Sequence, residues 1–215
     1  MKENLKWLML LPLAIVLAVV LALVIPRIFS DDSGSDSNGA GSASPNQSEA
    51  VQQEITDIQK KIDAANELIA ANPSDAEALK ELGISYEEIG KIQSDSKDLN
   101  GSLRSLKNAI DQFRRYLVLR PDDTEARIEL GLAYVEMGLL DLGERELRTV
   151  TVAAPANQRA WHSLGWALSQ EGKVQEAREA WLKSFTIDPA SSIGQESKAF
   201  FDQTAQNQPL STQAP

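Results

Sequence analysis

The feature that most constrains the fold is a regular repeat in the C-terminal half of the chain. Pro121, Pro155 and Pro189 are equally spaced, and Gly131 and Gly165 are separated by the same interval. Gly83 precedes this pair of glycines by a longer interval, one period plus two heptads. A sustained period of about 34 residues indicates helix–turn–helix units that bury their apolar faces only by stacking on one another.

Large, small and aromatic residues recur with the same step. Small residues let two helices approach closely, and bulky residues fill the space between them. The third unit has Trp161, Leu164, Gly165, Ala177 and Trp181, the second has Leu130, Gly131, Tyr134 and Gly143, and the first has Leu82, Gly83, Tyr86, Ala109 and Phe113. This pattern resembles the tetratricopeptide repeat (TPR) family. The resemblance implies an all-α solenoid of three helical hairpins, at residues 74–121, 122–155 and 156–189 within 73–189. Arg127 and Gly143 depart from the family pattern, so the second unit is the least typical.

The first unit is longer than the others by two heptads. Its second helix has apolar residues at 4-3-4-3-4 spacing from Leu99 to Leu117, so we expect both helices of this unit to be extended and joined at residues 94–97. A flexible loop over residues 91–102 is the alternative.

Two further helices are expected to flank the repeats. Residues 49–72 carry the same apolar spacing, beginning at Val51, and predict a long amphipathic helix. It could form a dimeric coiled coil, but packing against the first unit is favoured because the heptad run is short. Residues 190–206 predict a capping helix, and residues 207–215 predict a disordered tail.

The N-terminus predicts a membrane anchor at residues 1–29. The run Trp7–Ile25 has no charged residue, and 19 residues of helix span roughly 28 Å, about the hydrocarbon thickness of a bilayer. A cleaved signal peptide is the alternative, but the run is long and ends in bulky residues. Residues 30–48 read as a disordered Ser/Gly/Asp tether. Basic residues before the run predict a cytoplasmic N-terminus and an extracytoplasmic C-terminal domain, on the periplasmic or cell-surface side.

The resemblance implies that the first helix of each unit lines a concave groove. Several of these positions are apolar where a solvated face would be polar, which predicts a surface that binds a partner protein. Coverage by the chain's own termini or tether is the alternative. The expected groove residues are Lys80, Ile84, Ile128, Leu132, Val135, Arg159, His162 and Trp166.

Some members of the family bind the terminal carboxylates of chaperone tails through lysine, arginine and asparagine side chains. Lys80 and Arg159 match two of the basic positions. Ile84 and Glu129 stand where asparagine is needed, however, and Ser163 stands at another basic position. The resemblance therefore does not extend to carboxylate binding.

Composition excludes several other functions. A formal charge of −10 disfavours nucleic acid as a ligand. The chain has no cysteine and a single histidine, His162, with no nucleophile at a suitable spacing, so we expect no enzyme activity, cofactor or metal. The sequence predicts a membrane-tethered adaptor that binds a protein partner and supports assembly or recruitment of a membrane-associated complex. The alternative is a self-associating scaffold at the membrane, and hence a homo-oligomer.

Overall fold

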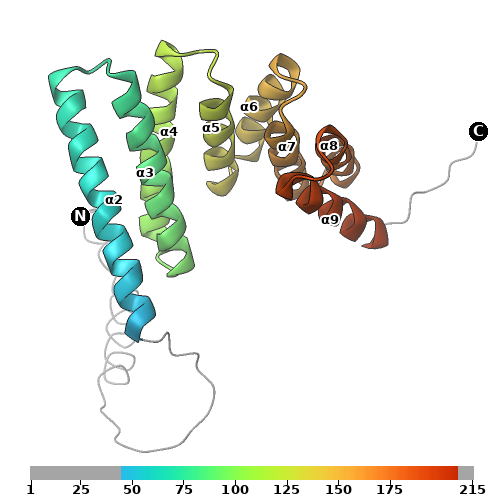
Figure 1. Cartoon of the computed structure of the whole chain (residues 1–215), viewed down its shortest axis with the longest axis horizontal. Helices are drawn as coiled ribbons and strands as arrows, with labels where there is room; N and C mark the ends of the chain where they lie inside the picture. Colours follow the sequence, from blue (N-terminus) through green and yellow to red (C-terminus); the bar gives the residue numbers. More distant parts are fainter. Residues whose placement is uncertain (1–44, 208–215) are drawn as a thin grey trace, which may run out of the picture. The chain divides into compact units, whose positions relative to one another are not determined.

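A computed structural model describes residues 45–207 of the chain. The expected anchor lies outside these residues, as do most of the tether and the tail. None of the helices described is both long and apolar enough to cross a bilayer. The described part contains eight α-helices in chain order (Figure 1). They are α2 (Pro45–Ala71), α3 (Ala76–Asp95), α4 (Leu99–Leu119), α5 (Thr124–Glu136), α6 (Leu140–Ala153), α7 (Gln158–Gln170), α8 (Val174–Ile187) and α9 (Ser192–Asn207).

The helices form three antiparallel hairpins, α3–α4, α5–α6 and α7–α8, each packed on the next. Helices α5, α7 and α9 begin one repeat period apart, so α9 is placed as the first helix of a further repeat. The backbones of successive first helices approach within 8 Å (Cα–Cα), whereas in the described part those of α4 and α6, and of α6 and α8, do not. The first helices therefore line the inner, concave side of the stack, and the second helices lie on its outer side.

The additional residues of the first repeat are divided equally between its two helices. Helix α3 has 20 residues where α5 has 13, and α4 has 21 where α6 has 14. Each helix is thus longer by one heptad, which keeps its apolar stripe on the same face. The extended hairpin expected from the sequence is what the structure contains, and the flexible loop is not.

The turn between the two helices has the same conformation in all three repeats. Gly138 and Gly172 adopt a positive φ of 76°, and Lys97 adopts 64° at the corresponding place in the first repeat. In each case the following amide donates a hydrogen bond to a carbonyl five residues back, as Asp98 N does to Gln93 O at 2.8 Å. This geometry ends a helix by satisfying its last carbonyls, and glycine adopts it most easily.

Helix α2 packs along α3, which buries the middle of its apolar stripe. Ile58, Ile62 and Ala65 form a core cluster with Leu82 and other residues of α3. A dimeric coiled coil would need this same stripe, so intramolecular packing is the arrangement observed. The helix begins at Pro45 and not at residue 49, because proline is well suited to the first turn of a helix. The expected tether is shorter by the same residues.

Close approach of the two helices in each repeat depends on glycine. A Cβ atom on Gly83 would lie 2.8 Å from Phe113, and one on Gly131 would lie 2.8 Å from Leu147. At Gly165 a Cβ would overlap the indole of Trp181 even more closely. The other residues assigned to repeat packing are buried, except for Tyr86, Tyr134 and Trp161, which are half-buried.

Arg127 departs from the family pattern in sequence but not in its main contact. Trp161 in the third repeat donates from Nε1 to the carbonyl of Pro155 at 2.9 Å. Arg127 occupies the same position one repeat earlier and donates from Nη2 to the carbonyl of Pro121 at 2.9 Å. It also pairs with Glu146 at 2.8 Å. Arginine therefore supplies the hydrogen bond to the proline carbonyl that tryptophan supplies in the third repeat.

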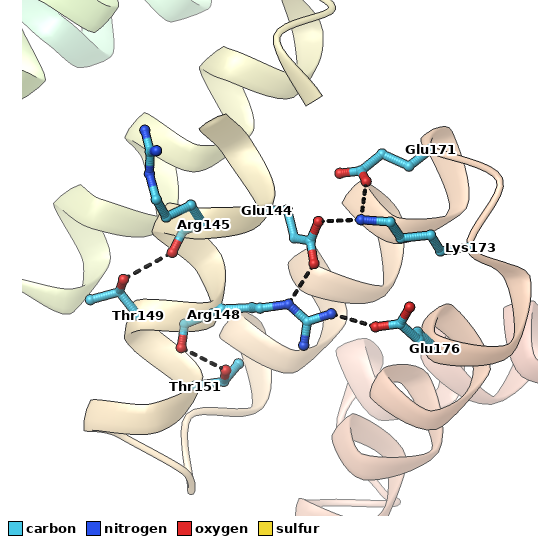
Figure 2. Close-up of polar contacts among 8 residues, drawn as sticks. All are labelled: Glu144, Arg145, Arg148, Thr149, Thr151, Glu171, Lys173 and Glu176. Atoms are coloured by element: carbon cyan, nitrogen blue, oxygen red, sulfur yellow. Dashed lines mark hydrogen bonds and ion pairs between the residues drawn. The ribbon is translucent and has the colours of Figure 1, made fainter. Parts of the chain in front are cut away.

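Ion pairs on the outer side join the second repeat to the third. Figure 2 shows the carboxylate of Glu144 on α6 between Lys173, at 2.6 Å, and Arg148, at 2.5 Å. Arg148 also reaches Glu176 on α8, and Lys173 reaches Glu171. Burial would raise the pKa of Glu144, but hydrogen bonds from Lys173 and Arg148 hold it below its ordinary value. These contacts fix how α6 sits against the α7–α8 hairpin.

Candidate protein-binding surface

The candidate site is the concave side of the stack, formed by α3, α5 and α7. A side-chain cap at each helix start fixes where these helices begin. Asp75, Asp123 and Asn157 each accept a hydrogen bond from the amide three residues later, at 3.0, 2.9 and 3.0 Å. Short polar side chains at this position satisfy amides that the first turn leaves without partners. The caps hold the groove positions of successive repeats in register.

Two of the expected groove residues lie in the core instead, so their prediction as groove residues is wrong. Ile128 is fully buried and Val135 is 5% exposed, and both belong to the cluster that α6, α7 and α8 build between the second and third repeats. Gly143 stands where the family usually has alanine, and a Cβ there would lie 2.5 Å from Val135 Cγ2. The missing methyl lets Val135 sink inward, away from any partner.

The apolar part of the concave face consists of Ile84, Leu132 and Trp166. Ile84 and Leu132 are half-buried, and each packs against a core cluster. Trp166 is 38% exposed, the greatest exposure of a large aromatic side chain in the described part. An exposed tryptophan on the same face as half-buried aliphatic residues gives a partner an apolar contact that the fold does not require for its own stability.

Lys80 is held by the chain's own acid at the boundary between the first and second repeats. Its Nζ donates to Asp123 Oδ2 at 2.8 Å, and the Tyr116 hydroxyl donates to the same oxygen at 2.6 Å. Burial opposes ionisation, but these two bonds and the amide of Ala126 lower the pKa of Asp123 to about 2. Lys80 therefore lies inside an ion pair and is not available to receive a carboxylate from a ligand.

Arg159 is neutralised in the same way one repeat later. Its guanidinium donates to Glu125 at 2.8 Å and to Glu129 at 2.6 Å, so α7 is tied to α5 across the concave face. Glu129 stands where carboxylate-binding relatives need asparagine. Both basic groove residues are thus engaged by carboxylates of this chain, in agreement with the incomplete set of carboxylate-binding residues in the sequence.

A buried acid, Glu87, lies at the end of the concave face where α3 extends past α5. The sequence places it beside Glu88 on what reads as a solvated helix surface, but its side chain is only 5% exposed. Burial, together with the charges of Glu129 and Glu136, raises its pKa to about 7 against the opposing effect of Lys91, which it contacts at 2.7 Å. No local sequence signal marks this residue, because its burial depends on the neighbouring repeat.

The step between the long and short hairpins also forms a small cavity of about 260 Å³. It exists because α5 ends near Glu136 while α3 and α4 continue for another heptad. Its lining residues are Gly90, Lys91, Ser94, Asp95, Ser102, Leu106 and Glu136.

His162 is occupied by the last helix of the array. Its Nδ1 lies 2.8 Å from Ser197 Oγ on α9, and its ring lies 6.0 Å from that of Phe200. Burial lowers the pKa of His162, with a further contribution from Arg159 and an opposing one from Glu196. The histidine is therefore a packing residue between α7 and α9, and α9 closes this end of the concave face.

Comparison with known proteins agrees with the repeat geometry. Residues 128–192 match the family model described as tetratricopeptide repeat. The chain contains tetratricopeptide repeats. The first repeat lies outside the matched range, yet it has the same hairpin and the same turn as the other two, and the glycine-to-aromatic contact of the third. No curated protein sequence matches the chain significantly.

Solved structures are similar to these repeats in fold. A crystal structure of MamA is 19% identical, with a TM-score of 0.54, and the match covers 77% of this chain and 95% of MamA. A second MamA structure is 22% identical, with a TM-score of 0.55, and covers 72% and 81%. The first TPR domain of Spaghetti (RPAP3), bound to an HSP90 peptide, is 13% identical over 60% of this chain and 94% of its own. Its TM-score of 0.46 is too low for binding residues to be compared.

Proposed function

We propose that this protein is a membrane-tethered adaptor that holds a partner protein on the concave face of its repeats. The observation that carries the proposal is the exposed side chain of Trp166 on the same face as Leu132, where Lys80 and Arg159 are already paired with acids of the chain. The apolar run Trp7–Ile25 would hold the repeats at a bilayer. Recruitment or assembly of a membrane-associated complex is the role that this combination serves.

The charges of the concave face indicate the chemistry of the partner. Carboxylates outnumber cations there, because Lys80, Lys91 and Arg159 are each balanced by an acid of the chain and further acids remain. The acids on or beside this face are Glu77, Glu87, Glu125, Glu129 and Glu136. A partner segment with basic residues flanking an apolar side chain would complement both the charge and Trp166.

Site-specific photo-crosslinking in native membranes tests this proposal. A photoreactive residue at Leu132 lies on the concave face, and a matched probe at Val152 lies on α6, where the side chain is 83% exposed on the outer side. We expect a heterologous adduct from the Leu132 probe that the Val152 probe does not give. Adding Trp166→Glu should reduce that adduct strongly. Identical adducts from both probes would overturn the assignment of the concave face.

The same experiment separates the adaptor from the self-associating scaffold. Adducts between two copies of this chain, with no heterologous band from the Leu132 probe, would favour the scaffold. The burial of Ile58, Ile62 and Ala65 against α3 disfavours a coiled coil of α2 as the route to self-association.

A further inference from the structure

The net charge of −10 conceals one basic helix face, on the outer side of α4. Arg104, Lys107, Arg114 and Arg115 recur at helical spacing and are all exposed, with Asp111 as the one acid of α4 among them. Residues spaced three and four apart share one side of a helix. We call these four residues the basic face of α4.

The cations of this face make no ion pair with any acid in residues 45–207, unlike half of the lysines and arginines described. Nine other cations pair with carboxylates; they lie on α2, α3, α5, α6, α7 and α9 and in the turn between α7 and α8. Arg115 donates only to the side chain of Gln112 and the carbonyl of Pro73, both uncharged. The most basic helix of this acidic chain therefore has no acidic partner within residues 45–207. This favours an anionic ligand from outside the chain.

Exposed aliphatic side chains border the same face. Leu99 is 66% exposed, Leu103 is 46% exposed and Val118 is 81% exposed. Leu99 and Leu103 belong to the same apolar stripe of α4 as Leu106 and Ile110, which are buried. Leu99 and Leu103 are exposed because they lie on the added heptad, where the shorter α5 does not cover them. Cations flanked by aliphatic residues suit the boundary between lipid headgroups and acyl chains, whereas a purely anionic polymer would make no use of the leucines.

The course of the chain brings this helix toward the proposed anchor. Helix α2 runs antiparallel to α3, with Lys61 lying 3.8 Å from Glu88, so the start of α2 and the start of α4 lie at the same end of the stack (Figure 1). The Ser/Gly/Asp tether expected from the sequence would have an r.m.s. reach of roughly 25 Å. A tether of that length would allow α4 to contact the membrane that holds the proposed anchor.

We propose that the basic face of α4 lies on an anionic lipid surface and orients the repeats at the membrane, leaving the concave face open to the partner. The inference rests on the membrane tether of the proposed function and adds a second, electrostatic contact to it. Because α4 and the concave face are on opposite sides of the first repeat, lipid contact and partner binding do not compete.

The test uses the full chain in vesicles. The protein has no cysteine, so Asn108→Cys on α4 gives a single labelling site for a fluorophore, and Glu179→Cys on the outer side of α8 gives the matched site. Vesicles of phosphatidylcholine alone are compared with vesicles containing about 30% phosphatidylserine, both carrying a quencher on the lipid headgroup. We expect quenching at Asn108→Cys that requires the anionic lipid, is lost near 1 M salt, where the screening length is about 3 Å, and is absent at Glu179→Cys.

Two charge variants provide a second test, in which lipid contact is again measured by quenching. R104Q/K107Q should reduce the equilibrium constant for lipid contact about fivefold per charge, or roughly 25-fold in total. R145Q/K183Q removes the same net charge from α6 and α8 and should leave quenching unchanged. Equal quenching in neutral vesicles, or equal loss with both variants, would overturn the proposal. The membrane anchor is tested separately, by flotation with neutral vesicles. A chain that does not float with them would contradict the anchor and not the lipid contact of α4.

Discussion

The substitution Gly90→Ala tests whether the first repeat is built as the structure shows. Gly90 follows Gly83 by seven residues, as Gly138 follows Gly131, so a repeat of ordinary length would place Gly90 at the turn. In the structure α3 continues through Gly90 to Asp95, whereas Gly138 adopts the left-handed conformation of the turn. The same substitution should therefore have opposite effects at Gly90 and Gly138.

The magnitudes follow from the surroundings of each glycine. A Cβ on Gly90 would lie 3.4 Å from Leu106 and 3.5 Å from Ser105, which is ordinary contact. Alanine is favoured over glycine inside a helix by about 1 kcal/mol, so Gly90→Ala should raise the free energy of unfolding by about 0.5–1 kcal/mol. A Cβ on Gly138 would meet nothing within 4 Å, but alanine pays roughly 1–2 kcal/mol for a positive φ.

Both variants can be measured as the full chain in mild detergent, by chemical and thermal denaturation followed by circular dichroism. One kcal/mol corresponds to a shift of roughly 2–4 °C in Tm for a protein of this size. We expect Gly90→Ala to unfold at a higher temperature than the parent chain and Gly138→Ala at a lower one. A loss of stability in Gly90→Ala comparable to that of Gly138→Ala would refute the extended hairpin.

Three further predictions concern packing and titration. Gly165→Ala should lower the free energy of unfolding by roughly 1–3 kcal/mol, because the added methyl overlaps Trp181; the same denaturation measures it, with Gly90→Ala as the control for an added methyl. Glu87 has a folded pKa of about 7, above its ordinary 4.5, so the stability it contributes is present below pH 4.5 and is lost as pH rises through 7. Glu87→Gln should remove this loss, which is about 2–3 kcal/mol of the free energy of unfolding at pH 8. Parallel plots of unfolding free energy against pH for the variant and the parent chain would contradict the burial of this acid. Asp123 has a folded pKa of about 2, so its stabilisation is present above pH 3.8 and is lost as pH falls toward 2. Asp123→Asn keeps the helix cap and should cost about 1–2 kcal/mol at pH 7 but much less at pH 2, as acid titration of unfolding would show.

The concave face was only partly predictable from the sequence. Periodic positions correctly placed Leu132 and Trp166 on the first helices and outside the buried core. The same rule placed Ile128 and Val135 beside them, but both are buried because the third repeat covers Ile128 and the absent methyl of Gly143 admits Val135. Burial at a shared boundary depends on what the next repeat presents, and periodicity within one helix carries no information about that.

The ion pairs were equally hard to predict from the sequence. Each helix surface reads locally as solvated, yet Glu87 is enclosed and Arg159 is bound by two acids of the preceding repeat. The partners of Arg159 are distant in the sequence, and the equal spacing of many acids gives no means of choosing among them. The unpaired basic face of α4 is visible only once all these pairs are known.

The sequence by itself determined the repeat architecture, because spaced glycine, aromatic and proline residues are local requirements of a helical hairpin. It also determined the two added heptads, since insertion of a whole heptad preserves the face on which each apolar residue lies. The tertiary structure alone decided which apolar residues remain accessible and which ions neutralise one another, and it distinguished between the two arrangements that the sequence allowed for α2. Those properties are set by contacts between neighbouring repeats, whose free energies depend on distance and burial rather than on order along the chain.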